Sequence, residues 1–109
     1  MLPKKNRADK KAVEEIFRKG KVVSSPLFTF KFVIADSKFL PPQISIIVPK
    51  TISKEAVNRN SLRRFGYSVL RKYIAKLPLG LAGVFIFKKY PSNIPIIDNE
   101  IKDIFNKIS

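Results

Sequence analysis

The chain has 109 residues, 45% of them hydrophobic, which predicts one globular domain spanning residues 1–109 around a modest core. Its 22 Lys and Arg residues outnumber its 8 Asp and Glu residues, and the formal net charge of +14 predicts a polyanionic partner. There is no Cys and no His, which excludes disulfides, thiolate catalysis and the usual zinc sites.

The first predicted element is a short helix from about Asp9 to Gly20. Asp9 is a candidate N-cap, and Gly20 suits the left-handed position that follows many helices. Val13, Ile16 and Phe17 fall on one face of this helix at helical spacing. We interpret this face as core, and for Phe17 a stacking role also remains open.

The segment from Leu27 to Ile34 alternates in the way expected of a half-buried strand. A period of two gives it a core face, with Phe28, Phe30, Phe32 and Ile34, and an opposite face, with Thr29, Lys31 and Val33. Because a lysine stands at the centre of the opposite face, that face suits a phosphate-bearing ligand.

A second strand, residues 43–48, follows a pair of prolines. The clearest helical pattern runs from about Glu55 to Leu77 and ends before a proline and a glycine. On a helical wheel this helix has an apolar stripe, formed by Leu62, Phe65, Gly66, Val69, Leu70 and Tyr73. The neighbouring face carries hydrogen-bonding side chains, namely Arg59, Asn60, Arg63, Arg64, Tyr67 and Arg71.

Residues 83–88 form a short apolar run bounded by turn residues, typical of an inner strand. A final helix is predicted with Asp98 as its cap, and Asp98 and Glu100 suit its dipole. The apolar positions of this helix are Ile101, Ile104, Phe105 and Ile108. Capping and the helix dipole explain the presence of these two acids better than a catalytic role does. The sequence shows no cluster of acidic residues that a two-metal mechanism could use.

Nucleic acid is favoured over membrane as the polyanion. No apolar run reaches the roughly 18–20 residues needed to span a bilayer. The basic start of the chain is not followed by the apolar core of a signal peptide. We therefore expect a cytoplasmic protein without a membrane partner.

The segment 50–64 holds the densest group of candidate RNA-binding residues. A run of charge is usually a solvated surface, and charge alone leaves that interpretation open. Arginine dominates the segment, an asparagine stands among the arginines, and almost no acid is available to pair with them. Arg grips phosphate bidentately, and Asn can hydrogen-bond a base edge or a ribose hydroxyl. The composition therefore favours RNA binding.

This segment resembles the bacterial ribonuclease P protein family, whose central helix opens with Ala-Val-x-Arg-Asn-Arg-x-Lys/Arg-Arg. Residues 56–64 read Ala-Val-Asn-Arg-Asn-Ser-Leu-Arg-Arg, and Lys50 follows the preceding strand, as in the family. The resemblance covers nearly the whole chain, including the Ile-Phe-Arg-Lys-Gly end of the first helix and the late Val-Phe-Ile-Phe strand. The chain departs from the family pattern at three positions. Ser61 replaces the second arginine of the motif. Tyr67 stands where many members have a basic residue, and Val13 stands where members often have an aromatic residue.

The resemblance implies an α+β fold in which a small mixed sheet is sandwiched with a central basic helix and two terminal helices. This fold is ribosomal protein S5 domain 2-like and has a left-handed βαβ crossover. The resemblance also implies the RNA-binding subunit of ribonuclease P, an endoribonuclease whose active site lies in its RNA. The RNA subunit, with Mg²⁺ ions that it mainly holds itself, would remove the 5′ leader from precursor tRNA. The protein alone would be inactive, with no catalytic residue and no metal ligand.

The family's RNA contacts map onto two groups of residues in this chain. The residues expected to bind the catalytic RNA are Lys50, Lys54, Arg59, Asn60, Arg63, Arg64 and Arg71. The residues expected to line a leader groove between the first helix and the sheet are Phe17, Thr29, Lys31 and Val33. The loop that carries Lys54 is one residue longer than is usual in the family. The implied partners are the catalytic RNA and precursor tRNA, with no obligate protein partner.

Two other classes of function remain. A ribosomal or other structural RNA-binding protein would share the charge and the fold, and processing of precursor tRNA with the cognate RNA distinguishes the two. An autonomous nuclease would be active with the catalytic RNA absent.

Overall fold

The computed structural model describes residues 4–34 and 41–108. Four strands form one mixed sheet in the order β1-β2-β4-β3, in which β1 pairs antiparallel with β2, β2 antiparallel with β4, and β4 parallel with β3. The strands are β1 (Lys21–Ser24), β2 (Phe28–Ile34), β3 (Gln43–Ile47) and β4 (Leu81–Phe87). The α+β class with a small mixed sheet is therefore confirmed.

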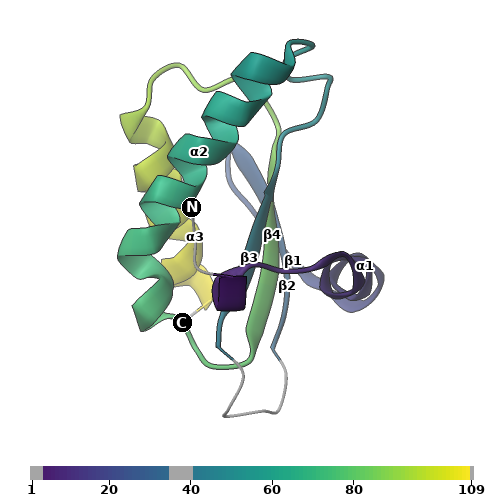
Figure 1. Ribbon diagram of the computed structural model, residues 1–109. Helices are drawn as coiled ribbons and strands as arrows, with labels where there is room; N and C mark the ends of the chain where they lie inside the picture. Colours follow the sequence, from purple (N-terminus) through teal and green to yellow (C-terminus); the bar gives the residue numbers. More distant parts are fainter. Residues whose placement is uncertain (1–3, 35–40, 109) are drawn as a thin grey trace.

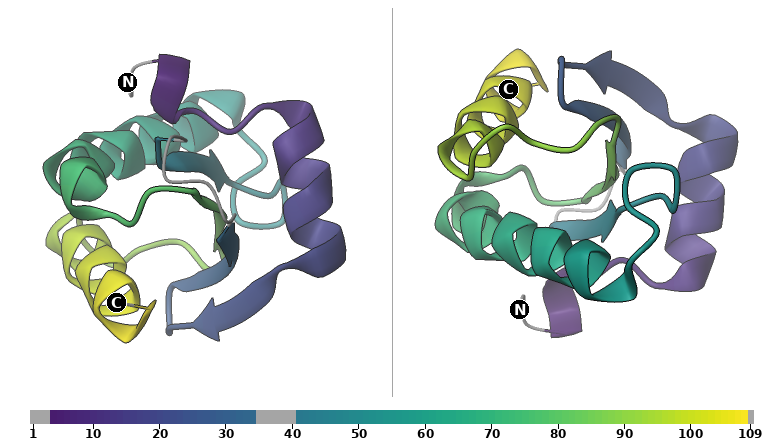
Figure 2. Two further views of the ribbon diagram at one scale, coloured as in Figure 1. Left: turned by 90° about the horizontal axis from the view of Figure 1, so that it is seen from below. Right: turned by 90° about the horizontal axis from the view of Figure 1, so that it is seen from above.

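Helices cover both faces of this sheet. Figures 1 and 2 show α1 (Lys10–Lys19) on one side, with α2 (Ala56–Tyr73) and α3 (Pro95–Ile108) side by side on the other. Two short 3-10 helices, η1 (Lys4–Asn6) and η2 (Ile74–Lys76), precede α1 and follow α2. Because β3 and β4 are parallel neighbours, α2 is the crossover between them. The left-handed sense of that crossover stays a prediction.

The main core lies between the sheet and the helices α2 and α3. Phe28, Phe30 and Phe32 of β2 are buried, as their alternation predicts. The Phe30 ring stacks on Phe85 of β4 at 4.3 Å between centroids and meets the edge of Phe105 of α3 at 5.9 Å. The aromatic rings therefore join strand to strand and sheet to helix.

The core prediction fails at three apolar side chains, of which the first, Phe17 of α1, is 43% exposed. Ile34, the last residue of β2, is 54% exposed, although its parity matches that of the three phenylalanines. Phe65 is 39% exposed because it lies at the edge of the apolar stripe of α2. The centre of that stripe is buried, through Leu62, Gly66, Val69 and Leu70.

The ends of α1 confirm one prediction and correct another. The Asp9 side chain accepts a hydrogen bond from the Ala12 N–H at 2.8 Å, as an N-cap does. Gly20 is not left-handed, since its φ of −68° and ψ of 148° are extended. Its requirement for glycine is steric, because a Cβ at this position would lie 2.4 Å from the Ile16 carbonyl oxygen.

The start of α3 differs from the prediction. The helix begins at Pro95, so Asp98 lies in its first turn and does not cap it. The Asn93 side-chain oxygen instead accepts a hydrogen bond from the Ile96 N–H at 3.0 Å. The proline suits the first helical position because its missing N–H would have no partner there.

The sequence analysis also misplaced the start of one strand and missed another strand entirely. Strand β4 begins at Leu81, two residues before the predicted run, and β1 was not predicted at all. β1 has four residues, too few for a two-residue period to stand out from the sequence. Strand β3 lies within the predicted range 43–48.

Contacts from other elements cover the outer edge of β3. Arg7 forms an isolated parallel bridge with Ile44, and the Asn6 side chain donates to the Pro42 carbonyl at 2.8 Å. The Ile46 N–H donates to the Tyr67 hydroxyl of α2 at 3.1 Å. These contacts satisfy part of an edge that could otherwise pair with another chain.

A close approach between α2 and β3 fixes the helix on the sheet. A Cβ at Gly66 would lie 2.5 Å from the Ile46 Cδ1 atom. A side chain at position 66 would therefore require the end of the Ile46 side chain to shift. The opposite side of α2, which carries the polar residues of the helix, therefore faces away from the sheet. Of the helices in the described ranges, none combines the length and the apolar character needed to cross a membrane.

Candidate nucleic-acid interface

The first candidate surface is the α2 basic face, which we define as Arg59, Asn60, Arg63, Arg64 and Arg71. Asn60, Arg64 and Arg71 are exposed, and Arg59 and Arg63 are half-buried. The ion pairs found among the described residues are Lys19–Glu15 and Lys72–Asp98, and neither involves this face. Its arginines are therefore not neutralised by carboxylates of the described residues.

Hydrogen bonds within the α2 basic face orient two of its side chains. The Arg63 guanidinium donates to the Asn60 side-chain oxygen one turn earlier on the helix. This contact uses the Asn60 oxygen and one guanidinium nitrogen of Arg63, and the side-chain NH₂ of Asn60 has two donors of its own. The structure thus brings together an arginine and an asparagine that the sequence predicted as RNA contacts.

Arg59 has a different environment from the other arginines of this face. Its Nη1 atom donates to the carbonyl oxygens of Ser53 at 3.0 Å and Lys54 at 2.8 Å. The side chain therefore folds back onto the loop that precedes α2. Sequence reasoning missed this contact, because nothing in the pattern distinguishes Arg59 from its neighbours.

The loop between β3 and α2, residues 48–55, carries Lys50 and Lys54, both exposed. The first turn of α2 contains no acidic residue, and the exposed N-cap residue Glu55 is the one acid of the loop beside the two lysines. A helix N-terminus is already positive through its free N–H groups, so the loop lysines strengthen that potential. Lys50 and Lys54 therefore extend the α2 basic face around the start of the helix.

The second candidate surface is the open sheet face, which we define as Thr29, Lys31 and Val33 of β2 with Phe17 of α1. All three β2 residues are half-buried. The Lys31 Nζ atom lies 4.8 Å from the centroid of the Phe17 ring, which is 43% exposed. The structure thus brings together the cation and the aromatic ring that the sequence assigned to a leader groove.

Helix α1 covers only part of this side of the sheet. Ile16 of α1 and Val84 of β4 are fully buried. Val33 lies in a hollow that α1 residues Ala12 and Glu15 also line. Thr29 pairs with Ser24 and Ile86 in the neighbouring strands. The four predicted residues therefore spread along one face, with Phe17 and Lys31 in contact at its middle.

Tyr67 and Ser61, which stand where the family pattern has basic residues, have different environments in this structure. Tyr67 accepts the Ile46 N–H described above, so its role in this chain is to hold the edge of the sheet. Ser61 is half-buried on α2, where a shorter hydroxyl replaces a basic side chain. The interface residues that this chain offers are therefore those of the α2 basic face and its loop.

The acids near the C-terminus are engaged in hydrogen bonds within the fold. Glu100 is 7% exposed, and its Oε1 atom accepts from Ser25 Oγ at 2.6 Å and from the Leu27 N–H at 2.7 Å. Within the described ranges, no three acidic side chains gather where they could hold a metal ion.

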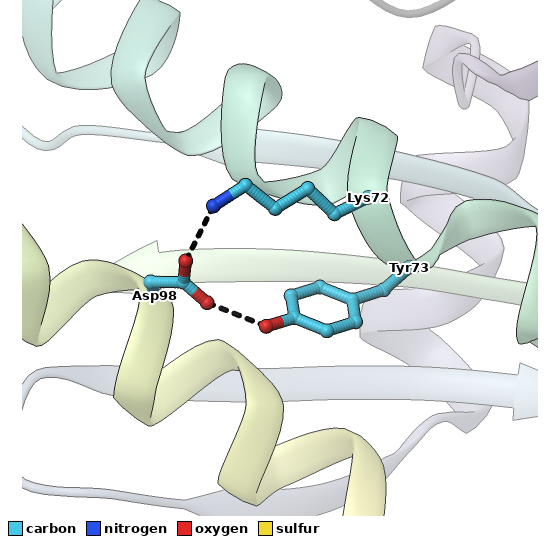
Figure 3. A network of polar contacts seen from close by, with 3 residues as sticks. All are labelled: Lys72, Tyr73 and Asp98. Atoms are coloured by element: carbon cyan, nitrogen blue, oxygen red, sulfur yellow. Dashed lines mark hydrogen bonds and ion pairs between the residues drawn. The ribbon is translucent and has the colours of Figure 1, made fainter.

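Asp98 joins the two helices that cover the core (Figure 3). Its Oδ2 atom accepts from Lys72 Nζ at 2.7 Å, and its Oδ1 atom accepts from the Tyr73 hydroxyl at 2.5 Å. These hydrogen bonds, the Lys72 one foremost, lower the pKa of Asp98 below its ordinary value. The hydrogen bond to Asp98 raises the pKa of Tyr73. Asp98 therefore serves as a link between α2 and α3.

Comparisons with known proteins agree on one family. A family model described as Ribonuclease P matches residues 2–109. A curated Ribonuclease P protein component from Synechococcus sp. (strain JA-2-3B'a(2-13)) is 32% identical over 91 residues, which cover 81% of this chain and 68% of the relative.

Solved structures show the same fold at low sequence identity. The RNase P protein from Thermotoga maritima has a TM-score of 0.81 at 19% identity and covers 94% of this chain and 97% of its own. The RNase P protein from Staphylococcus aureus has a TM-score of 0.80 at 19% identity, with 95% of both chains covered.

Proposed function

The chain belongs to the ribonuclease P protein family, and we propose that it assists a catalytic RNA in removing the 5′ leader from precursor tRNA. As a ribonuclease P protein it is a component of a complex with ribonuclease P RNA. The comparisons do not favour the alternative of a ribosomal or other structural RNA-binding protein.

The α2 basic face, with its loop lysines, would bind the catalytic RNA. The observation that carries this assignment is a set of arginines that the described carboxylates leave unpaired. Exposed, uncompensated guanidinium groups suit bidentate phosphate contacts, which are worth more than contacts by a point charge. The residues that we assign to binding of the catalytic RNA are Lys50, Lys54, Asn60, Arg63, Arg64 and Arg71. Arg59 differs from them because its guanidinium binds carbonyls of the loop.

The open sheet face would bind the single-stranded leader. Phe17 offers a partly exposed ring, and Lys31 lies directly over it. A ring and a cation at one place match the two requirements of single-strand binding, which are base stacking and phosphate neutralisation. Neither contact demands a particular base, so the surface accommodates leaders of different sequence. Thr29 and Val33 would line the path on either side of Lys31.

The protein alone is proposed to be inactive. Glu100 and Asp98 are committed to hydrogen bonds that hold the fold, which supports a structural role for both. We assign the hydrolysis to the RNA subunit and the Mg²⁺ ions that the RNA would hold. The protein's contribution is then positive potential and leader binding, which favour substrate and metal binding to the RNA.

The test is cleavage of precursor tRNA by a bacterial ribonuclease P RNA at low Mg²⁺, with and without this protein. We expect the protein to stimulate 5′ leader removal and to cleave nothing by itself. Binding to the RNA without stimulation would support the structural RNA-binding alternative. Cleavage with the RNA absent would identify an autonomous nuclease. The cytoplasmic location and the lack of an obligate protein partner stay predictions.

A further inference from the structure

Arg59 stands at the junction between the β3–α2 loop and the helix, in the first turn of α2. Its backbone N–H donates to the Glu55 carbonyl at 3.1 Å, while its Nη1 atom reaches back to Ser53 and Lys54. One charged group therefore binds two consecutive carbonyls of the loop. Hydrogen bonds from a charged donor are about twice as strong as those between neutral groups.

The two halves of this loop are held in different ways. In the first half Val48 is buried, and Ile52 packs against the core and donates its N–H to the Pro49 carbonyl at 3.0 Å. In the second half, Ser53 is half-buried and Lys54 is exposed. Burial thus fixes the start of the loop, and the hydrogen bonds from Arg59 restrain its end.

This geometry leads to a role for Arg59 that differs from that of the other arginines. We propose that Arg59 is a positioning residue, whose guanidinium holds the loop so that Lys50 and Lys54 together meet phosphates of the catalytic RNA. The inference rests on the proposed RNA-docking function and refines it. A loop held before binding loses less conformational entropy on contact with RNA, so its lysines contribute more affinity.

The first test uses the free protein and needs no RNA. NMR order parameters of the backbone amides of residues 48–55 are compared between the wild type, Arg59→Met and the control Arg71→Met. Arg71 is an exposed cation 12 residues along the same helix, roughly 18 Å from Arg59. We expect the order parameters of Ser53 and Lys54 to fall from about 0.85 to below about 0.6 in Arg59→Met and to stay unchanged in the control. Unchanged order parameters of Ser53 and Lys54 in Arg59→Met overturn the proposal.

The second test is a mutant cycle on affinity for the catalytic RNA. Arg59→Met is measured in the wild type and in a background that carries Lys50→Met and Lys54→Met. We expect a loss of about tenfold in the wild type and of less than about twofold in the background, because the affected contacts are already gone. Arg71→Met should weaken binding equally in both.

The possible outcomes separate this inference from the proposed function. Equal losses from Arg59→Met in both backgrounds mean a direct phosphate contact and overturn the positioning role, while stimulation of cleavage by the wild type would still support the function. If the two loop lysines do not affect RNA affinity, the positioning role is wrong for RNA binding. Failure of the wild type to stimulate cleavage counts against the proposed function, and the order-parameter experiment still tests the restraint on the loop.

Discussion

Strand β2 has two faces made from alternating residues, and the two differ in what they contact. On one face Phe28, Phe30 and Phe32 are buried among other aromatic rings. On the other face Lys31 is half-buried and its ammonium lies over the partly exposed ring of Phe17. Burial shows that one face supplies stability, and we propose that the other supplies leader binding, a separation that can be tested residue by residue.

The largest expected effect is on the core face. Phe30→Ala should lower the free energy of unfolding by about 3–5 kcal/mol, because it removes a fully buried ring and leaves a cavity beside Phe85. That is a large share of the stability of a small domain. Denaturant unfolding measures it, with Thr29→Ala on the opposite face as the control. A loss below about 1 kcal/mol would contradict the core assignment.

A smaller effect is expected where the chain enters β2. Glu100→Leu leaves Ser25 Oγ and the Leu27 N–H without their acceptor, at a cost of about 1–3 kcal/mol. Glu100→Gln keeps an oxygen acceptor of similar shape and should cost less. Thermal unfolding of the two variants gives the comparison. Equal stability of both would mean that these hydrogen bonds do not hold the turn before β2.

Phe17→Ala should affect both stability and binding. The ring is partly buried on α1, so its loss destabilises the fold partially, and its exposed part would stack on one base of the leader. We expect a leader-dependent affinity loss of about 1–3 kcal/mol in the assembled complex. Affinities for precursor and mature tRNA are the measurement. An equal loss for both substrates would assign Phe17 to the fold or to the RNA subunit.

The smallest effect concerns pH and lies away from both faces of β2. The folded-state pKa of Asp98 is lowered, so its contribution is present above the unfolded value of about 3.9 and is lost as pH falls through the folded pKa. Because Lys72 is largely exposed, the contribution at neutral pH should be below about 1 kcal/mol. Asp98→Asn should therefore be slightly less stable than the wild type at pH 7 and equal to it below the folded pKa. A difference that persists at low pH would contradict this assignment.

Much of the fold could be predicted from the sequence, because alternation and helical spacing report burial directly. The parity of β2 placed three phenylalanines in the core, and Asp9 marked the start of α1. The sequence pattern missed β1. Its four residues are too few to show an alternating pattern, and they form a strand because they pair with β2. The pattern also misplaced Asp98 as a cap, since a bond to Lys72 across two helices leaves no local signal.

The candidate site could be predicted in composition and less well in detail. The sequence identified the arginines of α2 as a group, and the structure leaves them unpaired by the described carboxylates. It could not distinguish Arg59, because a hydrogen bond to a loop carbonyl depends on where the loop turns. It could not foresee that Tyr67 would hold the edge of β3. Long-range hydrogen bonds of this kind follow from packing and have no periodic pattern.

If β2 separates stability from leader binding, Lys31→Ala should weaken binding of the leader and leave the fold intact. The variant is assembled on the catalytic RNA, and its affinities for precursor tRNA and for mature tRNA, which has no leader, are compared with its melting temperature. We predict a nearly unchanged melting temperature, weaker binding of precursor tRNA and unchanged binding of mature tRNA. Equal weakening for both substrates, or a large drop in melting temperature, would contradict this separation.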